Sequence, residues 1–170
     1  MDTFLAIVSR REVREYADRG LPEDVVERIL DAGRLAGSAS NRQPWRFVIV
    51  DDADARERLA ELCFEPENVR GARIVVAIAV SGKGPLAFDA GRAAENMLLA
   101  AWNEGVGSCP NASADWDAVA GVLGLEADER PAIVLTFGYP ARPRDPESRT
   151  AGEWSRRAGR KPLSELVARL

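Results

Sequence analysis

Apolar residues recur at helical spacing in several stretches of the chain. A Leu-Pro-Glu-Asp start, followed by apolar residues three and four positions apart, predicts a helix over residues 22–35. Short β-prone apolar runs at residues 47–50, 73–80 and 132–139 predict interior strands. The run at 73–80 is apolar on both faces, as in a sheet covered on both sides. The same helical spacing predicts further helices at residues 2–8, 53–62, 88–104, 114–123 and 163–170. Residues 64–71 break this periodicity and predict a loop or a single turn, and residues 105–110 predict a glycine-rich exit whose backbone is free to meet a ligand.

The order of these elements predicts the fold class. Helices interleave with only three or four strands, which is typical of an α+β or α/β sandwich of helices around a small sheet. The length of 170 residues fits one domain, 1–170. From Pro140 onward the chain is rich in proline, arginine and serine without periodicity, so residues 143–161 are interpreted as an extended arm. Such an arm either wraps a partner subunit or is disordered.

Residues 36–50, AGSASNRQPWRFVIV, combine a small, polar loop with the start of a buried strand. Small residues let a backbone approach a ligand closely. Pro44 restrains the residue before it to an extended conformation. The stretch therefore predicts a ligand-binding loop held on a rigid edge.

Composition removes several classes of chemistry. The chain contains no histidine, which excludes Ser-His-Asp and Cys-His catalysis and histidine-based zinc sites. A net charge of −4 argues against nucleic acid as a partner. No apolar window reaches the length of a membrane span, and the N-terminus lacks the order of a signal peptide, so we expect a cytoplasmic protein. Cys63 and Cys109 show no motif spacing and are predicted to be buried thiols.

Two basic clusters stand out on this acidic chain. One is formed by Arg10, Arg11 and Arg14, and the other lies within residues 142–161. They indicate a small anionic ligand or merely solvated charge. The acids at residues 51, 52 and 54 resemble a metal cluster at first sight, but acids after a strand favour a helix cap, so no metal site is predicted.

The ordered set of motifs resembles the nitroreductase family of FMN-dependent oxidoreductases over nearly the whole chain. An SxRRSxR-like segment is matched by Ser9, Arg10, Arg11 and Arg14. The PSxxNxQPW loop of the family is matched by Ser38, Asn41, Gln43, Pro44 and Trp45. An alanine-rich helix, GVGS at 105–108 and FGYP at 137–140 follow in the family's order.

The resemblance implies an α+β fold with a small, mainly antiparallel sheet sandwiched by helices. It also implies a homodimer with FMN at the subunit interface and a C-terminal extension that wraps the partner. Arg10, Arg11 and Arg14 then match contacts to the flavin phosphate, ribityl chain and pyrimidine edge. Arg160 or Lys161 matches the C-terminal anchor of the phosphate.

The remaining cofactor contacts are implied in the same way. Ser38, Ala39 and Asn41 match the loop that the other subunit supplies. Ala112 and Ser113 match backbone donors to the flavin N5 and O4 edge, and Asn68 is a further candidate contact. The catalytic chemistry would be that of the flavin, with no catalytic side chain and no metal.

The implied activity is transfer of a hydride from NAD(P)H to flavin N5 and then to an electron-poor acceptor, such as a nitroaromatic or a quinone, in a ping-pong cycle. Arg14 is the candidate cation beside N1 and O2 of the flavin. Three departures from the family pattern are Glu12 in place of serine, Gly37 in place of proline, and a short segment at residues 81–87. They keep open a flavin-sequestering protein, or an enzyme of the same fold with dehalogenating, flavin-fragmenting or deazaflavin chemistry.

Overall fold

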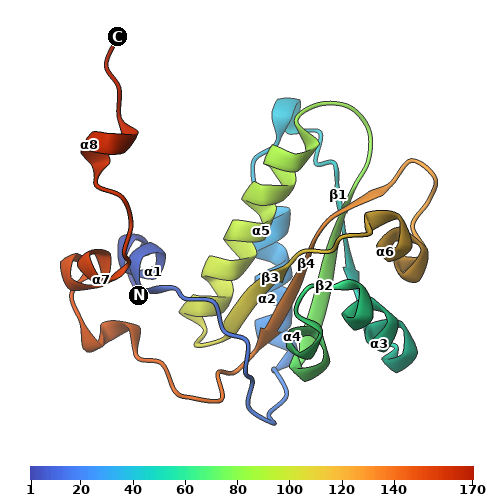
Figure 1. The fold of residues 1–170 in the computed structure, drawn as a ribbon, viewed down its shortest axis with the longest axis horizontal. Helices are drawn as coiled ribbons and strands as arrows, with labels where there is room; N and C mark the ends of the chain where they lie inside the picture. Colours follow the sequence, from blue (N-terminus) through green and yellow to red (C-terminus); the bar gives the residue numbers. More distant parts are fainter. The chain divides into compact units, whose positions relative to one another are not determined.

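A four-stranded antiparallel sheet forms the centre of the computed structural model, which describes residues 1–170 (Figure 1). The strand order is β1-β2-β4-β3. The register aligns Trp45 with Val80 across β1 and β2, and Gly107 with Gly138 across β3 and β4. The four strands are β1 (Trp45–Ile49), β2 (Ile74–Val80), β3 (Gly107–Asn111) and β4 (Arg130–Gly138).

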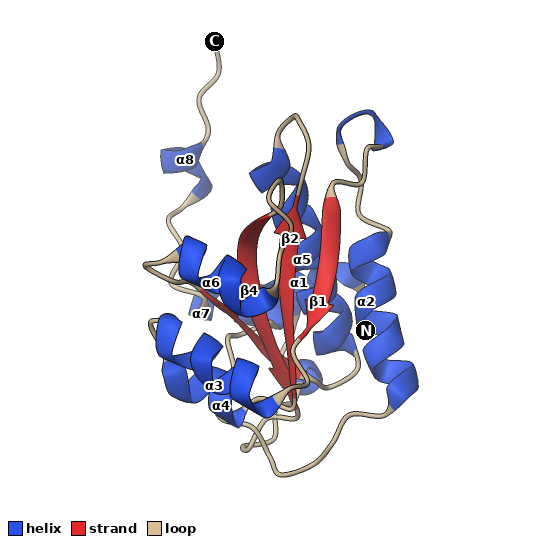
Figure 2. Cartoon of the chain, turned by 90° about the vertical axis from the view of Figure 1, so that its right-hand side faces the viewer, coloured by secondary structure: helices blue, strands red, loops and turns tan.

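Helices cover both faces of this sheet (Figure 2). One face packs on α2 and α5, and the other packs on α3, α4 and α6. The helices of these two layers are α2 (Glu23–Arg34), α3 (Ala53–Leu62), α4 (Pro66–Gly71), α5 (Leu86–Asn103) and α6 (Trp116–Leu123). This arrangement confirms the predicted α+β sandwich with a small antiparallel sheet.

Strand side chains alternate between two separate cores. Phe137 and Ile78 point to the α2–α5 side, where Met97 of α5 is fully buried with them. Val75 and Val134 point to the other side, toward the helices α3, α4 and α6. Fully burying a side chain of this size stabilises the fold by about 1.5–3 kcal/mol. The continuous apolar run that predicted a doubly covered strand is therefore β2.

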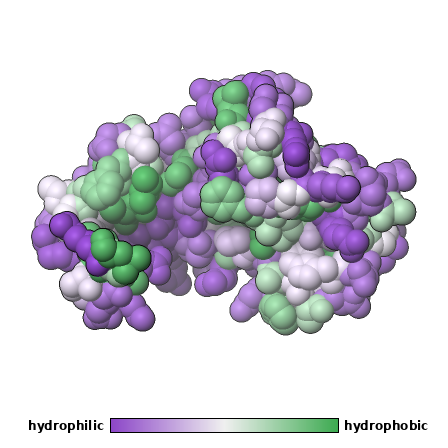
Figure 3. Space-filling view, turned by 90° about the horizontal axis from the view of Figure 1, so that it is seen from above, coloured by the Kyte–Doolittle hydropathy of each residue, from purple (hydrophilic) through white to green (hydrophobic).

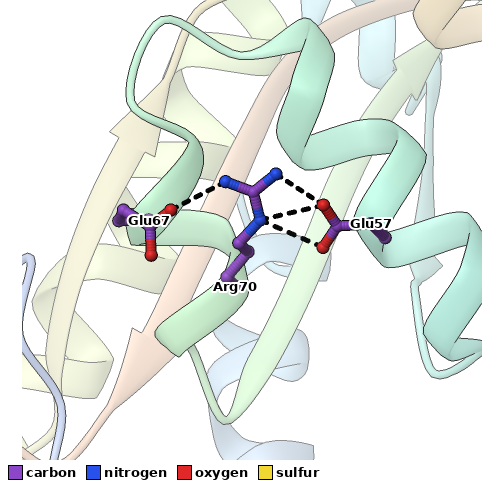
Figure 4. Close-up of polar contacts among 3 residues, drawn as sticks. All are labelled: Glu57, Glu67 and Arg70. Atoms are coloured by element: carbon purple, nitrogen blue, oxygen red, sulfur yellow. Dashed lines mark hydrogen bonds and ion pairs between the residues drawn. The ribbon is translucent and has the colours of Figure 1, made fainter.

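Polar groups fix where the helices begin and how they lie together. The Asp52 carboxylate accepts a hydrogen bond from the Ala55 N–H at 2.7 Å, which confirms the capping interpretation of the acids after β1. Arg70 of α4 binds Glu57 of α3 and Glu67 of its own helix (Figure 4). The guanidinium thus joins the two short helices on this face of the sheet.

Three sequence predictions were wrong in local structure. The glycine-rich exit at residues 105–110 contains strand β3, because its backbone hydrogen-bonds along β4 despite a sequence of weak β propensity. The segment 64–71 is not a loop or single turn but contains α4, which starts at Pro66. The predicted last helix, 163–170, ends at Leu166.

The chain divides into two compact units. One consists of Arg11–Pro143, and the other combines Met1–Arg10 with Arg144–Leu170. The second unit contains α1 (Thr3–Ser9), η2 (Pro146–Ser148), α7 (Ala151–Arg157) and α8 (Leu163–Leu166). The predicted single domain 1–170 stays a prediction.

The arm is more structured than its sequence predicted. Thr150 and Glu153 form a capping box at the start of α7, and α1 packs against that helix. The Trp154 indole donates to the Pro146 carbonyl at 2.8 Å.

Apolar residues remain exposed in this unit, and Figure 3 shows apolar areas among the polar surface. Among them are Phe4, Ile7, Leu163 and Leu166. No helix is both long and apolar enough to span a bilayer.

Candidate functional site

The loop before β1 has an unusual backbone. Ser40, Asn41 and Gln43 all adopt positive φ, with values of 53°, 53° and 49°. A non-glycine residue in this left-handed region costs about 1–2 kcal/mol. Three such residues within four positions persist only when neighbouring structure holds them there, and such strain is typical of functional sites.

Several contacts hold this loop in place. The Asp89 carboxylate, on the first turn of α5, accepts a hydrogen bond from the Ala39 N–H at 3.1 Å, and Asp89 is only 2% exposed. The Ser38 hydroxyl accepts from the Gln43 N–H at 2.9 Å. The Arg42 guanidinium donates to the Lys83 carbonyl at 3.0 Å. The predicted ligand-binding loop is therefore fixed to the beginning of α5.

Gly37, one of the three departures from the family pattern, has a local reason. A Cβ atom at this position would lie 2.1 Å from the Nη2 atom of Arg92. This atom is the end of the exposed side chain of Arg92, in the second turn of α5, so a larger residue at position 37 would require that side chain to move. Gly37 and Arg92 therefore pack against each other where the loop meets α5.

A second group of candidate residues lies beside β3, on the extended segment that includes Arg11 and Arg14. This segment joins the sheet edge through a hydrogen bond from the Val13 N–H to the Ser108 carbonyl at 3.0 Å. Gly107 permits the approach, because a Cβ there would lie 2.7 Å from the side chain of Val13. Arg11 is half-buried and Arg14 is exposed. The two cations are therefore carried along the β3 edge.

Tyr16, at the end of this segment, joins a buried polar cluster. Its hydroxyl lies 2.9 Å from the Thr136 hydroxyl. The Asn68 amide donates to Asn111 Oδ1 at 2.6 Å, and the Thr136 hydroxyl lies 3.1 Å from the Cys109 carbonyl. Burial raises the pKa of Tyr16 well above its ordinary value. This cluster connects the segment, α4, β3 and β4.

The two cysteines are buried, as their isolated positions predicted. Burial raises the pKa of the Cys63 thiol and, with a smaller contribution from the Glu12 carboxylate, that of the Cys109 thiol. Both thiols are therefore kept protonated at neutral pH, the form that does not act as a nucleophile. The site offers no cysteine nucleophile.

Ala112 and Ser113 follow β3 directly. The Ser113 hydroxyl donates to the Leu62 carbonyl at 2.7 Å and accepts from the Asp115 N–H at 3.0 Å. The Ala112 carbonyl accepts from the Phe64 N–H at 3.1 Å. These bonds fix the turn after β3, so its backbone has a defined orientation.

The predicted site residues fall into three groups. Arg11, Arg14, Asn68, Ala112 and Ser113 lie along β3 and its surroundings, whereas Ser38, Ala39 and Asn41 lie before β1. Arg10, Arg160 and Lys161 belong to the unit formed by the two chain ends, and the last two are exposed between α7 and α8.

The first two groups are far apart within one chain. β1 and β3 are the opposite edges of the sheet, three strand spacings or about 14 Å apart. Along β4 the register displaces Trp45 from Gly107 by about 27 Å and from Asn111, which precedes Ala112, by about 14 Å. The strand order therefore places the loop and the β3 group at opposite edges of the sheet.

A cleft of about 810 Å³ opens between α2 and the free edge of β1. Its lining mixes aromatic and charged side chains, including Trp45, Phe47, Asp31 and Arg34. β1 has a strand partner only on its β2 side. The cleft is therefore bordered by backbone groups that no strand of the same chain pairs.

Several residues that build these two regions stand in no recognisable sequence pattern. Asp89 and Arg92 lie in a helix that the sequence marks only as alanine-rich. The one feature that could have drawn attention to this helix is the carboxylate of Asp89 among small residues in the first turn. Tyr16, Asn111 and Thr136 carried no signal, because their cluster forms only when four distant segments meet.

Known proteins share the sequence pattern and the fold of this chain. The sequence profile of the nitroreductase family matches residues 7–81 and 67–139. A protein of Methanothermobacter thermautotrophicus, named an NADH dehydrogenase/NAD(P)H nitroreductase, is 31% identical over 156 residues, covering 83% of this chain and 78% of its own. A nitroreductase structure from Desulfovibrio desulfuricans, in complex with FMN, has a TM-score of 0.83 at 27% identity and covers 100% of this chain and 98% of its own. An iodotyrosine deiodinase of Haliscomenobacter hydrossis is 34% identical over 58 residues, which is 34% of this chain and 26% of its own.

Proposed function

The chain belongs to the nitroreductase family and is an oxidoreductase, and on that premise we propose that it binds FMN and transfers hydride from NAD(P)H to an electron-poor acceptor such as a nitroaromatic or a quinone. The observation that carries this proposal is the pair of regions described above. One is a cationic segment along β3, and the other is a strained loop anchored to α5.

The residues present fit FMN. Arg11 and Arg14 supply guanidinium groups suited to a phosphate or to an anionic ring edge. Ser108 has a hydroxyl that is completely buried without a hydrogen-bond partner, at the strand that this cationic segment joins. Three further cations remain proposed contacts of the FMN phosphate. They are Arg10, Arg160 and Lys161, which belong to the unit formed by the two chain ends. These residues therefore fit FMN in their charge and in the hydrogen-bonding groups that they offer.

When bound, FMN supplies a ring that accepts and releases a hydride. Arg14 would hold positive charge at the pyrimidine edge, where negative charge must be stabilised. The ordered turn at Ala112 and Ser113 would orient the opposite edge of the ring. No protein acid or base is needed for hydride transfer itself, which suits a chain without histidine. The nicotinamide donor and the acceptor would use the site in turn.

We propose that the site is composite and forms in a homodimer. The loop with Ser38, Ala39 and Asn41 lies at the opposite edge of the sheet from the β3 group. A single chain therefore brings only one of the two groups to a given flavin. A two-fold related partner supplies the other, and the same pairing builds two equivalent sites.

The cleft beside β1 suits a partner segment in the same dimer. An edge strand with unpaired backbone groups accepts an extended chain by strand addition. The occupant we propose is the arm of the partner, residues 143–161, of which the stretches outside η2 and α7 are extended enough to pair with β1. Charge does not decide the assignment, because Asp24 and Asp31 of the cleft already pair with Arg28 and Arg34. The free backbone edge of β1 is what supports it.

Purification followed by a visible spectrum tests the cofactor. We expect a yellow protein with bound flavin, which NAD(P)H bleaches under anaerobic conditions. A colourless protein that takes up no added FMN would refute the cofactor assignment. A yellow protein that NAD(P)H does not bleach would refute the reductase activity alone.

A dehalogenating activity is the second candidate, favoured by the local similarity to iodotyrosine deiodinase. An anaerobic screen of the reduced protein against a nitroaromatic, a quinone and an iodinated phenol separates the two. Release of iodide without reduction of the other acceptors would favour the second candidate. Tight FMN binding without consumption of NAD(P)H on any acceptor would instead favour a sequestering protein.

A further inference from the structure

We propose that Asp89 is a positioning residue for the cofactor site, and that it holds the Ser38–Gln43 loop in its ligand-binding shape before any flavin arrives. The inference rests on the proposed FMN-binding function. It adds a role for α5, from which neither sequence patterns nor the family resemblance assigned a contact.

A buried carboxylate needs a reason to be where it is. Asp89 is 2% exposed, and taking an ionised group out of water is costly unless hydrogen bonds compensate. Asp89 lies in the first turn of α5, where the helix dipole favours a negative charge. Across the fold it accepts a hydrogen bond from the Ala39 N–H, fifty residues away in sequence. The carboxylate thus links the start of α5 to the start of the loop.

The loop needs such an anchor. Ala39, the second residue of the loop, is held by Asp89, and the strained residues Ser40 and Asn41 follow it directly. Asn41 is exposed, so burial in the core does not fix its conformation. The Arg92 guanidinium, one turn along the same helix, lies against Gly37. α5 therefore contacts the chain on both sides of Ser38, and the hydrogen bond from Asp89 is the directional one of the two contacts.

Composite assembly makes this pre-organisation necessary. If the loop serves the flavin of the partner, contacts within its own subunit must set its shape. A loop ordered in advance loses less conformational entropy when the site forms, so it contributes more to affinity. Asp89 would act through the position of the Ala39 backbone and would not touch the cofactor.

The test compares FMN affinity in three variants of the full-length protein. Asp89→Ala removes the acceptor, and we expect the dissociation constant of FMN to rise by about tenfold or more. Asp89→Asn keeps an acceptor oxygen without the charge, and we expect it to restore affinity to within about threefold of the wild type. The matched control is Asp54→Ala, which removes an exposed carboxylate from the first turn of α3. Quenching of free-flavin fluorescence measures each affinity.

A further variant removes the same bond from the other side. Ala39→Pro deletes the N–H donor, and the backbone tolerates it, because Ser38 is extended (φ −137°, ψ 161°) and Ala39 opens a helical turn. We expect Ala39→Pro to weaken FMN binding. The double variant Asp89→Ala, Ala39→Pro should lose less binding free energy than the two single variants lose together. This non-additivity identifies the bond itself. Strict additivity would overturn the proposal.

Hydrogen exchange on the flavin-free protein supplies a readout that a general loss of stability does not give. In Asp89→Ala we expect faster exchange at the amides of residues 39–43 and unchanged exchange in β2. Unchanged loop exchange with unchanged FMN affinity would overturn the role of Asp89 while leaving the proposed function standing. A wild-type protein that binds no FMN, yet has a protected loop, would refute the proposed function and this role with it.

Discussion

Two glycines determine how closely the segment carrying Arg11 and Arg14 lies against the sheet. A Cβ at Gly107 would collide with Val13, and a Cβ at Gly138 would lie 2.8 Å from the ring of Tyr16. Tyr16 also anchors the buried polar cluster. At these positions the absent side chain is what allows the cationic segment to reach β3.

The first prediction concerns Gly138. Gly138→Ala should lower the free energy of unfolding by about 1–3 kcal/mol, because the added methyl overpacks against Tyr16. Urea denaturation measures the change. Gly121→Ala on α6 is the matched control, since nothing lies within 4 Å of its Cβ position, and it should be neutral or stabilising. Equal effects at the two positions would contradict the close approach of Tyr16.

The second prediction is a pH dependence at Glu129. Its hydrogen bonds from Arg46, and then from the Glu126 N–H, lower its pKa from 4.5 to about 2. The charged form is thus favoured in the folded state, so the stabilisation is complete above pH 4.5 and is lost as the pH falls toward 2. Glu129→Gln should be less stable than wild type at pH 7, and the difference should shrink over that window.

Arg46→Met provides the reciprocal test, because it removes the partner and leaves the carboxylate in place. Chemical denaturation at pH 7, 4 and 2.5 should show the same convergence with wild type. A constant stability difference at all three pH values would mean that this ion pair does not set the pKa of Glu129.

At the scale of elements, sequence patterns predicted what depends on burial within one segment. α2 carries its apolar residues on one face and has acids in its first turn, and β2 is apolar throughout, so both were located to within two residues. β3 was missed because Gly107, Ser108 and Pro110 have no strand propensity, and only pairing with β4 makes them a strand. α7 was missed because its sequence lacks an apolar face, although its capping box was present in the sequence.

The candidate site likewise combines features that a local sequence pattern predicts with features that depend on contacts between distant segments. The loop could be predicted because small residues, Pro44 and an apolar run are adjacent in sequence. Its anchor on Asp89 could not, since that contact joins residues fifty positions apart. The separation of the loop from the β3 group could not be predicted either, because it follows from the strand order rather than from any local pattern.

The third prediction concerns α7. Thr150→Ala should destabilise this helix by about 0.5–2 kcal/mol, because the capping box loses both its hydroxyl acceptor for the Glu153 N–H and its contact with the Glu153 carboxylate. Hydrogen exchange at the amides of Trp154 and Ser155 measures the change. Ser155→Ala, an exposed substitution in the same helix, should have little effect. Unchanged exchange in Thr150→Ala would refute the capping role.

At the scale of the whole molecule, the composite site can be tested by mixing subunits. Suppose that Arg14→Ala and the double variant Ser38→Val, Asn41→Ala each abolish FMN binding alone. When subunits of the two variants reassociate at random, half of the dimers contain one subunit of each variant. Each of these mixed dimers has one intact site out of two, so about one quarter of all FMN sites should be restored. Equilibrium dialysis with FMN counts the sites. A mixture that recovers none would place both groups in the site of one chain.

The extended arm gives a second prediction at this scale. Deleting residues 143–161 should raise the dimer dissociation constant by at least about tenfold, if the partner's arm occupies the cleft beside β1. Sedimentation velocity over a range of concentrations measures the equilibrium. A truncated protein that dimerises like the full chain would contradict the wrapping assignment, whereas the composite site would remain possible.

The free edge of β1 also bears on how the protein behaves when it is not assembled. An uncovered edge strand is a template for pairing with other copies, so solubility should depend on the supply of partner segments. Loss of the arm should therefore raise aggregation at a given protein concentration, through β1 rather than through general unfolding. Ile49→Lys would place a charge at an exposed position on that edge and should restore soluble yield to the truncated chain. The backbone edge that we propose to receive a partner's arm would thus make the isolated subunit prone to form disordered or fibrous assemblies.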